Sequence, residues 1–152
     1  MRIRLNCETT FDCAHSLPYH EGKCSNYHGH TYRLRVTVED YNGCIEKNSR
    51  GVHSYVNPDE SAYLTEYQLH SPRTGMVMDF ADLKAEVNSV LEMLDHGNLN
   101  AYIENPTAEN LVLYIADKLS VLLRTHHAVQ LVELKLWETP NNWVTWTNNG
   151  EC

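Results

Sequence analysis

Two runs of alternating residues dominate the first forty positions of this 152-residue chain. From Ile3 to His15, apolar residues, two cysteines, one threonine and the histidine occupy the odd positions, and polar or charged residues occupy most even ones. From His28 to Glu39, histidines and apolar residues share the even positions. Because side chains alternate between the two faces of a strand, both runs predict half-buried β-strands.

Helical periodicity follows in the second half of the chain. Asp79 is a candidate N-cap for one helix, which Gly97 is expected to stop. A second helix is expected from Pro106 or Thr107, since proline suits a first helical turn and threonine can cap it. The two predicted apolar stripes comprise Phe80, Leu83, Val87, Val90, Leu91 and Leu94, and Leu111, Tyr114, Ile115, Leu119 and Leu122.

Two more strands are expected after the second helix. The face of the first is predicted to carry Val132, Leu134, Leu136 and Glu138, and that of the second Val144 and Trp146. The order ββααββ predicts an α+β fold, with a four-stranded antiparallel sheet and both helices on one face. A length near 150 residues favours a single domain, residues 1–152. We interpret the turn-rich segment at about 41–74 as an extended insertion between the second strand and the first helix.

Composition excludes several classes of function. The formal net charge of −8 argues against a nucleic-acid-binding groove, which needs clustered Lys and Arg. No apolar run approaches the roughly 18 residues of a membrane helix. The five cysteines are an odd number without paired spacing, which favours a reducing, cytoplasmic setting over a disulfide framework. Cys7 and Cys13 fall on the inward parity and are interpreted as core fillers.

Three histidines have the pattern of a metal site. His28 and His30 leave the same face of one strand about 7 Å apart at the backbone. His15 ends the other strand at inward parity, so a hairpin between the strands brings all three imidazoles together. Three neutral imidazoles suit zinc and leave a fourth position open, as in catalytic sites. The alternative is that each histidine packs or hydrogen-bonds in the core.

Cys24 lies on the short loop before His28 and is therefore expected near the metal. Its thiolate is either a general base, a nucleophile or the fourth zinc ligand. A fourth protein ligand would close the site, so the chain would then be a non-catalytic zinc-stabilised binding module.

Two further groups are candidates for chemistry. Asp95 and His96 are expected to close the first helix as a proton-transfer pair, the alternative being a C-cap histidine beside a solvated aspartate. Glu138 is an acid where the strand pattern predicts an apolar residue, and a planar heterocycle with adjacent N–H donors would satisfy its carboxylate. Alternatively, the strand has already ended and Glu138 is solvated.

These motifs together resemble the 6-pyruvoyltetrahydropterin synthase family. The matching segments are Phe11-Asp12-Cys13-Ala14-His15, Cys24-x3-His28-Gly29-His30, Gly75-Met76-Val77-Met78-Asp79-Phe80, Leu94-Asp95-His96-x2-Leu99-Asn100, Pro106-Thr107-Ala108-Glu109-Asn110 and Glu138-Thr139-Pro140. The gap of three residues between Cys24 and His28 resembles the 6-carboxytetrahydropterin synthase branch of the queuosine pathway.

The resemblance implies a tunnelling fold that assembles into a homohexamer of two stacked trimers, with active sites between subunits. It implies a lyase that converts 7,8-dihydroneopterin triphosphate to 6-carboxy-5,6,7,8-tetrahydropterin, a 7-deazaguanine precursor, with synthesis of 6-pyruvoyltetrahydropterin as the alternative. His15, His28 and His30 would bind zinc, and Cys24, Asp95 and His96 would be catalytic. Glu138 and Thr107 would bind the pterin.

Overall fold

The computed structural model describes residues 3–40, 76–127 and 129–148, so the predicted insertion at about 41–74 lies outside the described residues. Its elements are β1 (Arg4–His15), the 3₁₀ turn η1 (Lys23–Ser25), β2 (His28–Asp40), α1 (Phe80–Leu91), β3 (Gly97–Asn98), the 3₁₀ turn η2 (Leu99–Ala101), α2 (Ala108–His126), β4 (Val129–Thr139) and β5 (Asn142–Thr147).

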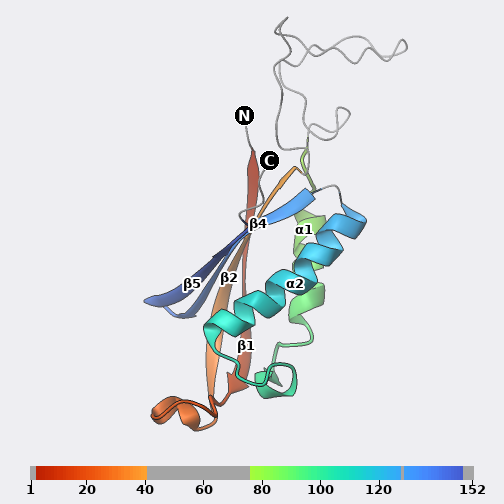
Figure 1. The fold of residues 1–152 in the computed structure, drawn as a ribbon. Helices are drawn as coiled ribbons and strands as arrows, with labels where there is room; N and C mark the ends of the chain where they lie inside the picture. Colours follow the sequence, from red (N-terminus) through yellow and green to blue (C-terminus); the bar gives the residue numbers. More distant parts are fainter. Residues whose placement is uncertain (1–2, 41–75, 128, 149–152) are drawn as a thin grey trace, which may run out of the picture.

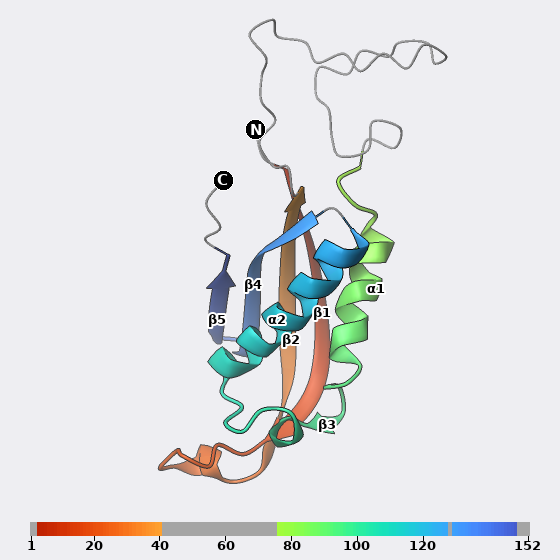
Figure 2. The same cartoon turned by 45° about the vertical axis from the view of Figure 1, so that its right-hand side comes forward.

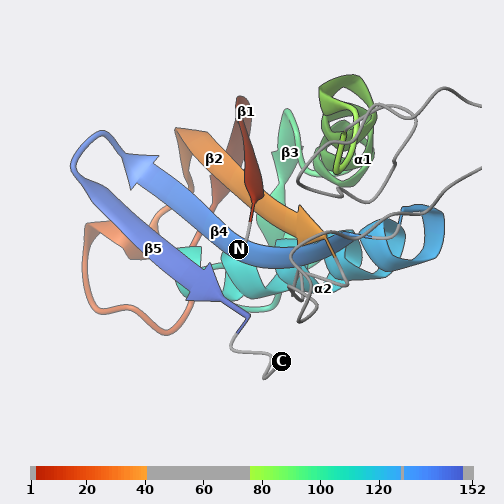
Figure 3. The same cartoon turned by 90° about the horizontal axis from the view of Figure 1, so that it is seen from above.

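The sheet has five strands in the order β3-β1-β2-β4-β5, which Figure 3 shows from above. β1 and β2 form a long antiparallel hairpin, from the pair Arg4 and Glu39 to the pair His15 and His28. β4 and β5 extend the sheet in antiparallel fashion on the other side of β2. The two helices lie on one face of this sheet, as the α+β prediction expected (Figures 1 and 2).

The predicted sheet of four strands lacks β3, which runs parallel to β1 and pairs with Cys13 and Ala14. The element order is therefore ββαβαββ rather than ββααββ. A strand of two residues is too short to show any alternation, so hydrophobic periodicity could not reveal it.

The caps of both helices form as predicted. Asp79 accepts a hydrogen bond from the backbone N–H of Ala81 at 2.7 Å, and the Thr107 hydroxyl accepts one from the N–H of Asn110 at 3.3 Å. The predicted end of the first helix is wrong. α1 ends at Leu91, and the chain turns through His96, which adopts a left-handed backbone with φ 55°. Gly97 is the first residue of β3 and does not cap the helix.

Most of the predicted apolar residues are buried between the helices and the sheet. Phe80 is an exception, with 53% of its surface exposed at the first position of α1. Val132 is buried, with 7% of its surface exposed, but it lies outside the core cluster, because the register between β2 and β4 shifts between Thr37 and Val38. Leu131 instead pairs with Val38 and joins the core, so a bulge breaks the simple parity expected for β4.

Several connections meet at one end of the sheet. The last residues of β1, the first residues of β2, the loop with η1, the short strand β3 and the start of α2 gather there (Figure 2). Of the described part of the chain, no helix is long and apolar enough to cross a membrane. The functional residues predicted from sequence concentrate at this end.

Candidate functional site

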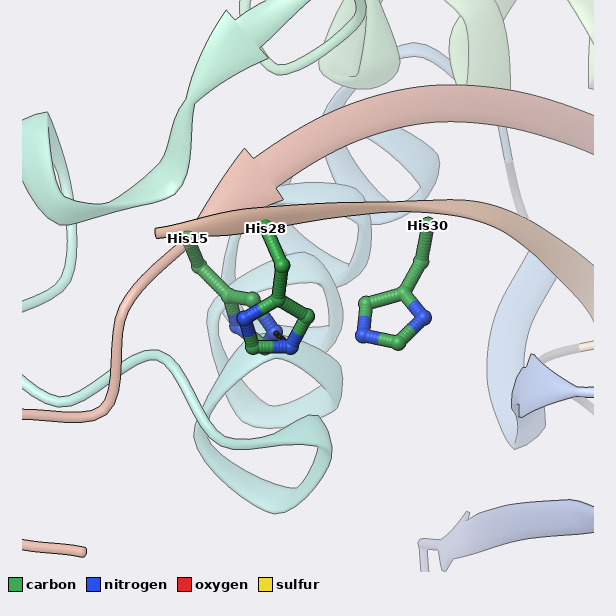
Figure 4. A group of neighbouring side chains, drawn as sticks. All are labelled: His15, His28 and His30. Atoms are coloured by element: carbon green, nitrogen blue, oxygen red, sulfur yellow. Dashed lines mark hydrogen bonds between the residues drawn. The ribbon is translucent and has the colours of Figure 1, made fainter. Parts of the chain in front are cut away.

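The three predicted histidines converge on one face of the hairpin. His15 and His28 are direct partners across β1 and β2, and His30 follows two residues later on the same face of β2. Their ring centroids lie 4.6 to 5.2 Å apart, and their rings hang from the same side of the strands (Figure 4). One ligand atom from each lies within 4.8 Å of the others, so the group can hold a metal ion.

Hydrogen bonds orient two of these rings for metal binding. His15 Nδ1 lies 2.7 Å from the carbonyl oxygen of Pro106, and His28 Nδ1 lies 2.8 Å from that of Asn26. A carbonyl only accepts, so Nδ1 of each ring is the donor, and the neutral form of each ring then leaves the lone pair of Nε2 available to a metal ion. This is the arrangement that fixes a metal-binding tautomer.

The two Nε2 atoms that result are close together. His15 Nε2 and His28 Nε2 lie 3.2 Å apart, where two lone pairs repel unless a proton or a cation lies between them. Two nitrogens bound tetrahedrally to one zinc ion, each at roughly 2.0–2.1 Å, are separated by about 3.4 Å. The spacing therefore fits a shared metal ion.

His30 completes the donor set. Its Nε2 is buried and has no hydrogen-bond partner among the described residues, which is costly for a polar atom unless a ligand satisfies it. Burial lowers the pKa of His30, partly offset by the nearby Glu138 carboxylate. The ring is therefore neutral at pH 7 and able to donate its lone pair.

Glu138 lies beside this group rather than in solvent. Its Oε1 is 3.8 Å from Nε2 of both His15 and His30, and its side chain is 29% exposed. The hydroxyl of Tyr32, a fully buried residue, donates a hydrogen bond to the same oxygen at 3.2 Å. Tyr32 was not singled out from sequence as a site residue, although its parity matches that of His28 and His30.

Cys24 lies on η1, within the loop that joins the two histidine-bearing strands. It is half-buried, and its carbonyl accepts a hydrogen bond from the N–H of Leu17 at 2.9 Å. Its sulfur is not one of the ligand atoms that the three histidines bring within 4.8 Å. Cys7 and Cys13 are buried as expected, and burial raises the pKa of Cys13 to about 12, so its thiol is inert.

Asp95 and His96 form the predicted pair, but away from the histidines of the same chain. The two side chains lie 3.0 Å apart, from Asp95 Oδ2 to His96 Nδ1, and Asp95 Oδ1 accepts a hydrogen bond from the N–H of Asp12 at 2.8 Å. On β1, the side chains of Asp12 and His15 point to opposite faces of the sheet, because the two positions differ in parity. The helix-dipole argument for His96 is wrong, because α1 has already ended at Leu91.

Thr107 is half-buried next to Pro106, and its hydroxyl oxygen caps α2. The structure thus gives it a structural role, while its predicted contact with a substrate stays a prediction. Besides Tyr32, Pro106 and Asn26 are site residues that sequence reasoning missed. They act through backbone carbonyls, which leave no signature in side-chain patterns.

A family model described as 6-pyruvoyl tetrahydropterin synthase matches residues 4–149 of the chain. The chain belongs to this family. Membership in the 6-pyruvoyl tetrahydropterin synthase family makes it a pterin-processing enzyme of the lyase type.

Individual relatives of this family carry different activities in their names. Dihydroneopterin monophosphate aldolase of Pyrococcus furiosus is 34% identical over 138 residues, which cover 91% of each chain. 6-Carboxy-5,6,7,8-tetrahydropterin synthase of Synechocystis sp. is 35% identical over 130 residues, covering 83% of this chain and 82% of its own. The structure of 6-pyruvoyl tetrahydropterin synthase from Caenorhabditis elegans aligns with a TM-score of 0.69 at 26% identity, covering 98% of this chain and 97% of that one.

Proposed function

We propose that this chain is a zinc-dependent 6-carboxytetrahydropterin synthase. It would convert 7,8-dihydroneopterin triphosphate and one water molecule to 6-carboxy-5,6,7,8-tetrahydropterin, acetaldehyde and triphosphate, as a step toward 7-deazaguanine compounds such as queuosine. The observation that carries the proposal is the convergence of three histidine nitrogens beside the half-buried carboxylate of Glu138. The relative of that name in Synechocystis sp. supports the choice of reaction.

His15, His28 and His30 would hold the zinc ion, with a fourth position left for substrate. The ion, when bound, polarises and acidifies the hydroxyl groups of the substrate side chain. The protein's own contribution is a fixed set of lone pairs, since the carbonyls of Pro106 and Asn26 hold two of the rings.

Glu138 would anchor the pterin ring. The Tyr32 hydroxyl uses one lone pair of Oε1, so the second lone pair of Oε1 and those of Oε2 can accept N–H groups of the pterin. Charge-assisted hydrogen bonds of this kind are stronger than neutral ones and fix orientation as well as affinity. The 2-amino group and N3 of a pterin present adjacent donors on one edge of the ring, which matches a carboxylate. Thr107 would assist from the start of α2.

Cys24 would act as the general base on the substrate side chain, with Asp95 and His96 of a neighbouring subunit completing proton transfer. The location of Asp95 on the side of β1 away from the histidines of its own chain supports a role across an interface. We propose a homohexamer for the same reason, with sites at subunit boundaries. β5 is an outer strand of the sheet formed by the described residues, and the backbone groups of an outer strand can join sheets.

Product identification tests the reaction. The purified, zinc-loaded protein is incubated with 7,8-dihydroneopterin triphosphate, and we expect stoichiometric acetaldehyde and 6-carboxytetrahydropterin. Retention of the three-carbon side chain would instead indicate 6-pyruvoyltetrahydropterin. Absence of turnover in a protein with bound zinc would refute both.

A second candidate is cleavage of dihydroneopterin monophosphate, favoured by the 34% identity to the Pyrococcus furiosus aldolase. A retro-aldol reaction breaks the bond between the first two side-chain carbons, so it releases a two-carbon phosphorylated aldehyde instead of acetaldehyde. Supplying the monophosphate and the triphosphate in parallel, and identifying the aldehyde from each, separates the two activities.

A zinc-stabilised binding module without catalysis is the remaining alternative from sequence. It requires Cys24 as a fourth ligand, and its sulfur is not among the converging ligand atoms of the described residues. This arrangement supports the open, catalytic form of the site.

A further inference from the structure

The segment that follows α1 is bound along the last residues of β1. Asp95 accepts a hydrogen bond from the N–H of Asp12, and the two residues of β3 pair in parallel with Cys13 and Ala14. The next contact along the same edge is made by a side chain, that of Asn100 in η2. It lies opposite Ser16, the residue immediately after His15.

Asn100 bonds both backbone groups of Ser16. The N–H of Ser16 donates to Asn100 Oδ1 at 2.9 Å, and Asn100 Nδ2 donates to the carbonyl oxygen of Ser16 at 2.9 Å. A carboxamide carries a donor and an acceptor in one plane, so it replaces the partner that a longer β3 would have supplied. The half-buried Asn100 is itself held by the Asn98 side chain, which accepts from its N–H at 3.1 Å.

Ser16 connects two groups of the site. On one side it is covalently joined to His15, whose ring is fully buried. On the other side lies Leu17, whose N–H donates to the carbonyl oxygen of Cys24 at 2.9 Å. The position of Ser16 therefore determines where the His15 backbone ends and where the loop with Cys24 begins.

We propose that Asn100 is a positioning residue for both His15 and Cys24. It holds Ser16 by two hydrogen bonds and thereby fixes the metal ligand on one side and the loop of the thiol on the other. The inference rests on the proposed function insofar as it treats these two residues as parts of one site. The hydrogen bonds of the Asn100 side chain go to the Ser16 backbone, so its effect is transmitted through the backbone of residues 15–17.

The test uses N100A, which removes both hydrogen bonds, and N88A as the matched control. Asn88 is exposed on α1, and its side chain makes no interaction with described residues. For N100A we expect zinc affinity to fall by about 10-fold, as for partners that orient metal ligands elsewhere. We also expect an altered visible spectrum of the cobalt-substituted protein, several-fold faster hydrogen exchange at the Leu17 amide, and a changed rate of Cys24 alkylation.

A folded N100A protein with wild-type zinc affinity, cobalt spectrum and Cys24 alkylation rate would overturn the proposal, even if its melting temperature were lower. Should N100A fail to fold, N100D serves instead, because it keeps an acceptor for the Ser16 N–H and replaces the donor to the Ser16 carbonyl with a carboxylate oxygen. An effect of N100D on these readouts equal to that of N88A would also overturn it. None of these measurements uses turnover, so an inactive wild-type protein would refute the proposed reaction and leave this result standing on its own.

Discussion

Two groups of three potential ligands lie at the same end of β1, and they differ in what their polar atoms already do. In each group, one ligand atom per residue lies within 4.8 Å of the others: His15, His28 and His30 on one face, and Asp12, Asp95 and His96 at the other. The members of the second group are all exposed, whereas the histidines are buried or half-buried.

In the second group, the carboxylates of Asp12 and Asp95 already accept hydrogen bonds. Asp95 accepts from the backbone of Asp12 and pairs with His96, and Asp12 accepts a short hydrogen bond from Thr31. The histidine group instead directs two bare Nε2 atoms at each other and leaves a third, that of His30, unsatisfied. Closeness alone therefore does not make a metal site. A metal site also needs ligand atoms that lack a partner, and of these two groups the histidines leave such a buried nitrogen among the described residues, Nε2 of His30.

The largest expected effect is on zinc binding, and it should differ between substitutions in the two groups. H30A should lower zinc affinity by more than about 1,000-fold, since loss of an orienting partner alone costs about 10- to 100-fold. H96A should leave zinc affinity unchanged. Elemental analysis and competition with a chelating dye measure both. Zinc loss in H96A equal to that in H30A would show that the exposed group binds the metal.

C24A should lower kcat by at least about 100-fold, the usual contribution of a general base, while zinc content stays at the wild-type level. Cys13 provides the control. Burial raises its pKa to about 12 and so keeps its thiol protonated, and C13A should therefore keep most of the activity. Zinc analysis and steady-state kinetics on the same preparations decide. Loss of zinc from C24A would make Cys24 a ligand and the site a structural one.

Y32F tests whether the hydrogen bond from Tyr32 to Glu138 supports substrate binding. Removal of one hydrogen bond should raise KM by about 3- to 10-fold with kcat and zinc content nearly unchanged. Y114F removes a hydroxyl from a half-buried tyrosine of α2, outside the site, and should leave both constants unaltered. An unchanged KM in Y32F would mean that Glu138 needs no support from the phenol.

The smallest effect concerns the exposed group. The hydrogen bond from the Asp12 N–H, reinforced by His96, lowers the pKa of Asp95 below its ordinary value of 3.8. The ionised carboxylate thus stabilises the fold above about pH 4, and this contribution is lost as the pH falls through the folded-state pKa. The melting temperature of D95N should lie slightly below that of wild type at pH 6, and the two should converge toward pH 3. If the difference in melting temperature between D95N and wild type did not change with pH, the charge of the carboxylate would not be its cause. The matched control is D117N, at an exposed aspartate of α2.

Strand parity and helical spacing predicted the main elements and the three histidines, because those signals depend on side chains repeating along a single element. Glu138 was predicted from the same logic, as a carboxylate where an apolar residue was expected. The errors fall where local geometry interrupts repetition: the two-residue β3, the bulge at Val132, and the turn at His96 that separates α1 from Gly97.

Long-range supports of the site were beyond prediction for a different reason. The Pro106 carbonyl and the Asn100 carboxamide reach His15 and Ser16 across 91 and 84 residues of sequence. Their positions depend on how the loops around α2 and after α1 close, which no periodicity encodes. Asn100 was visible only as a member of a family motif, without a stated role.

The β1–β2 hairpin also has a consequence for the order of folding. The three histidine nitrogens that could hold a metal ion belong to residues 15–30, so closing one short loop is enough to bring them together, at low entropic cost. The supports from residues 100 and 106 arrive only when the remainder of the chain has docked. A metal ion can thus meet a nascent hairpin early and weakly, and then be held tightly once folding is complete, so that metal capture and the final steps of folding reinforce each other.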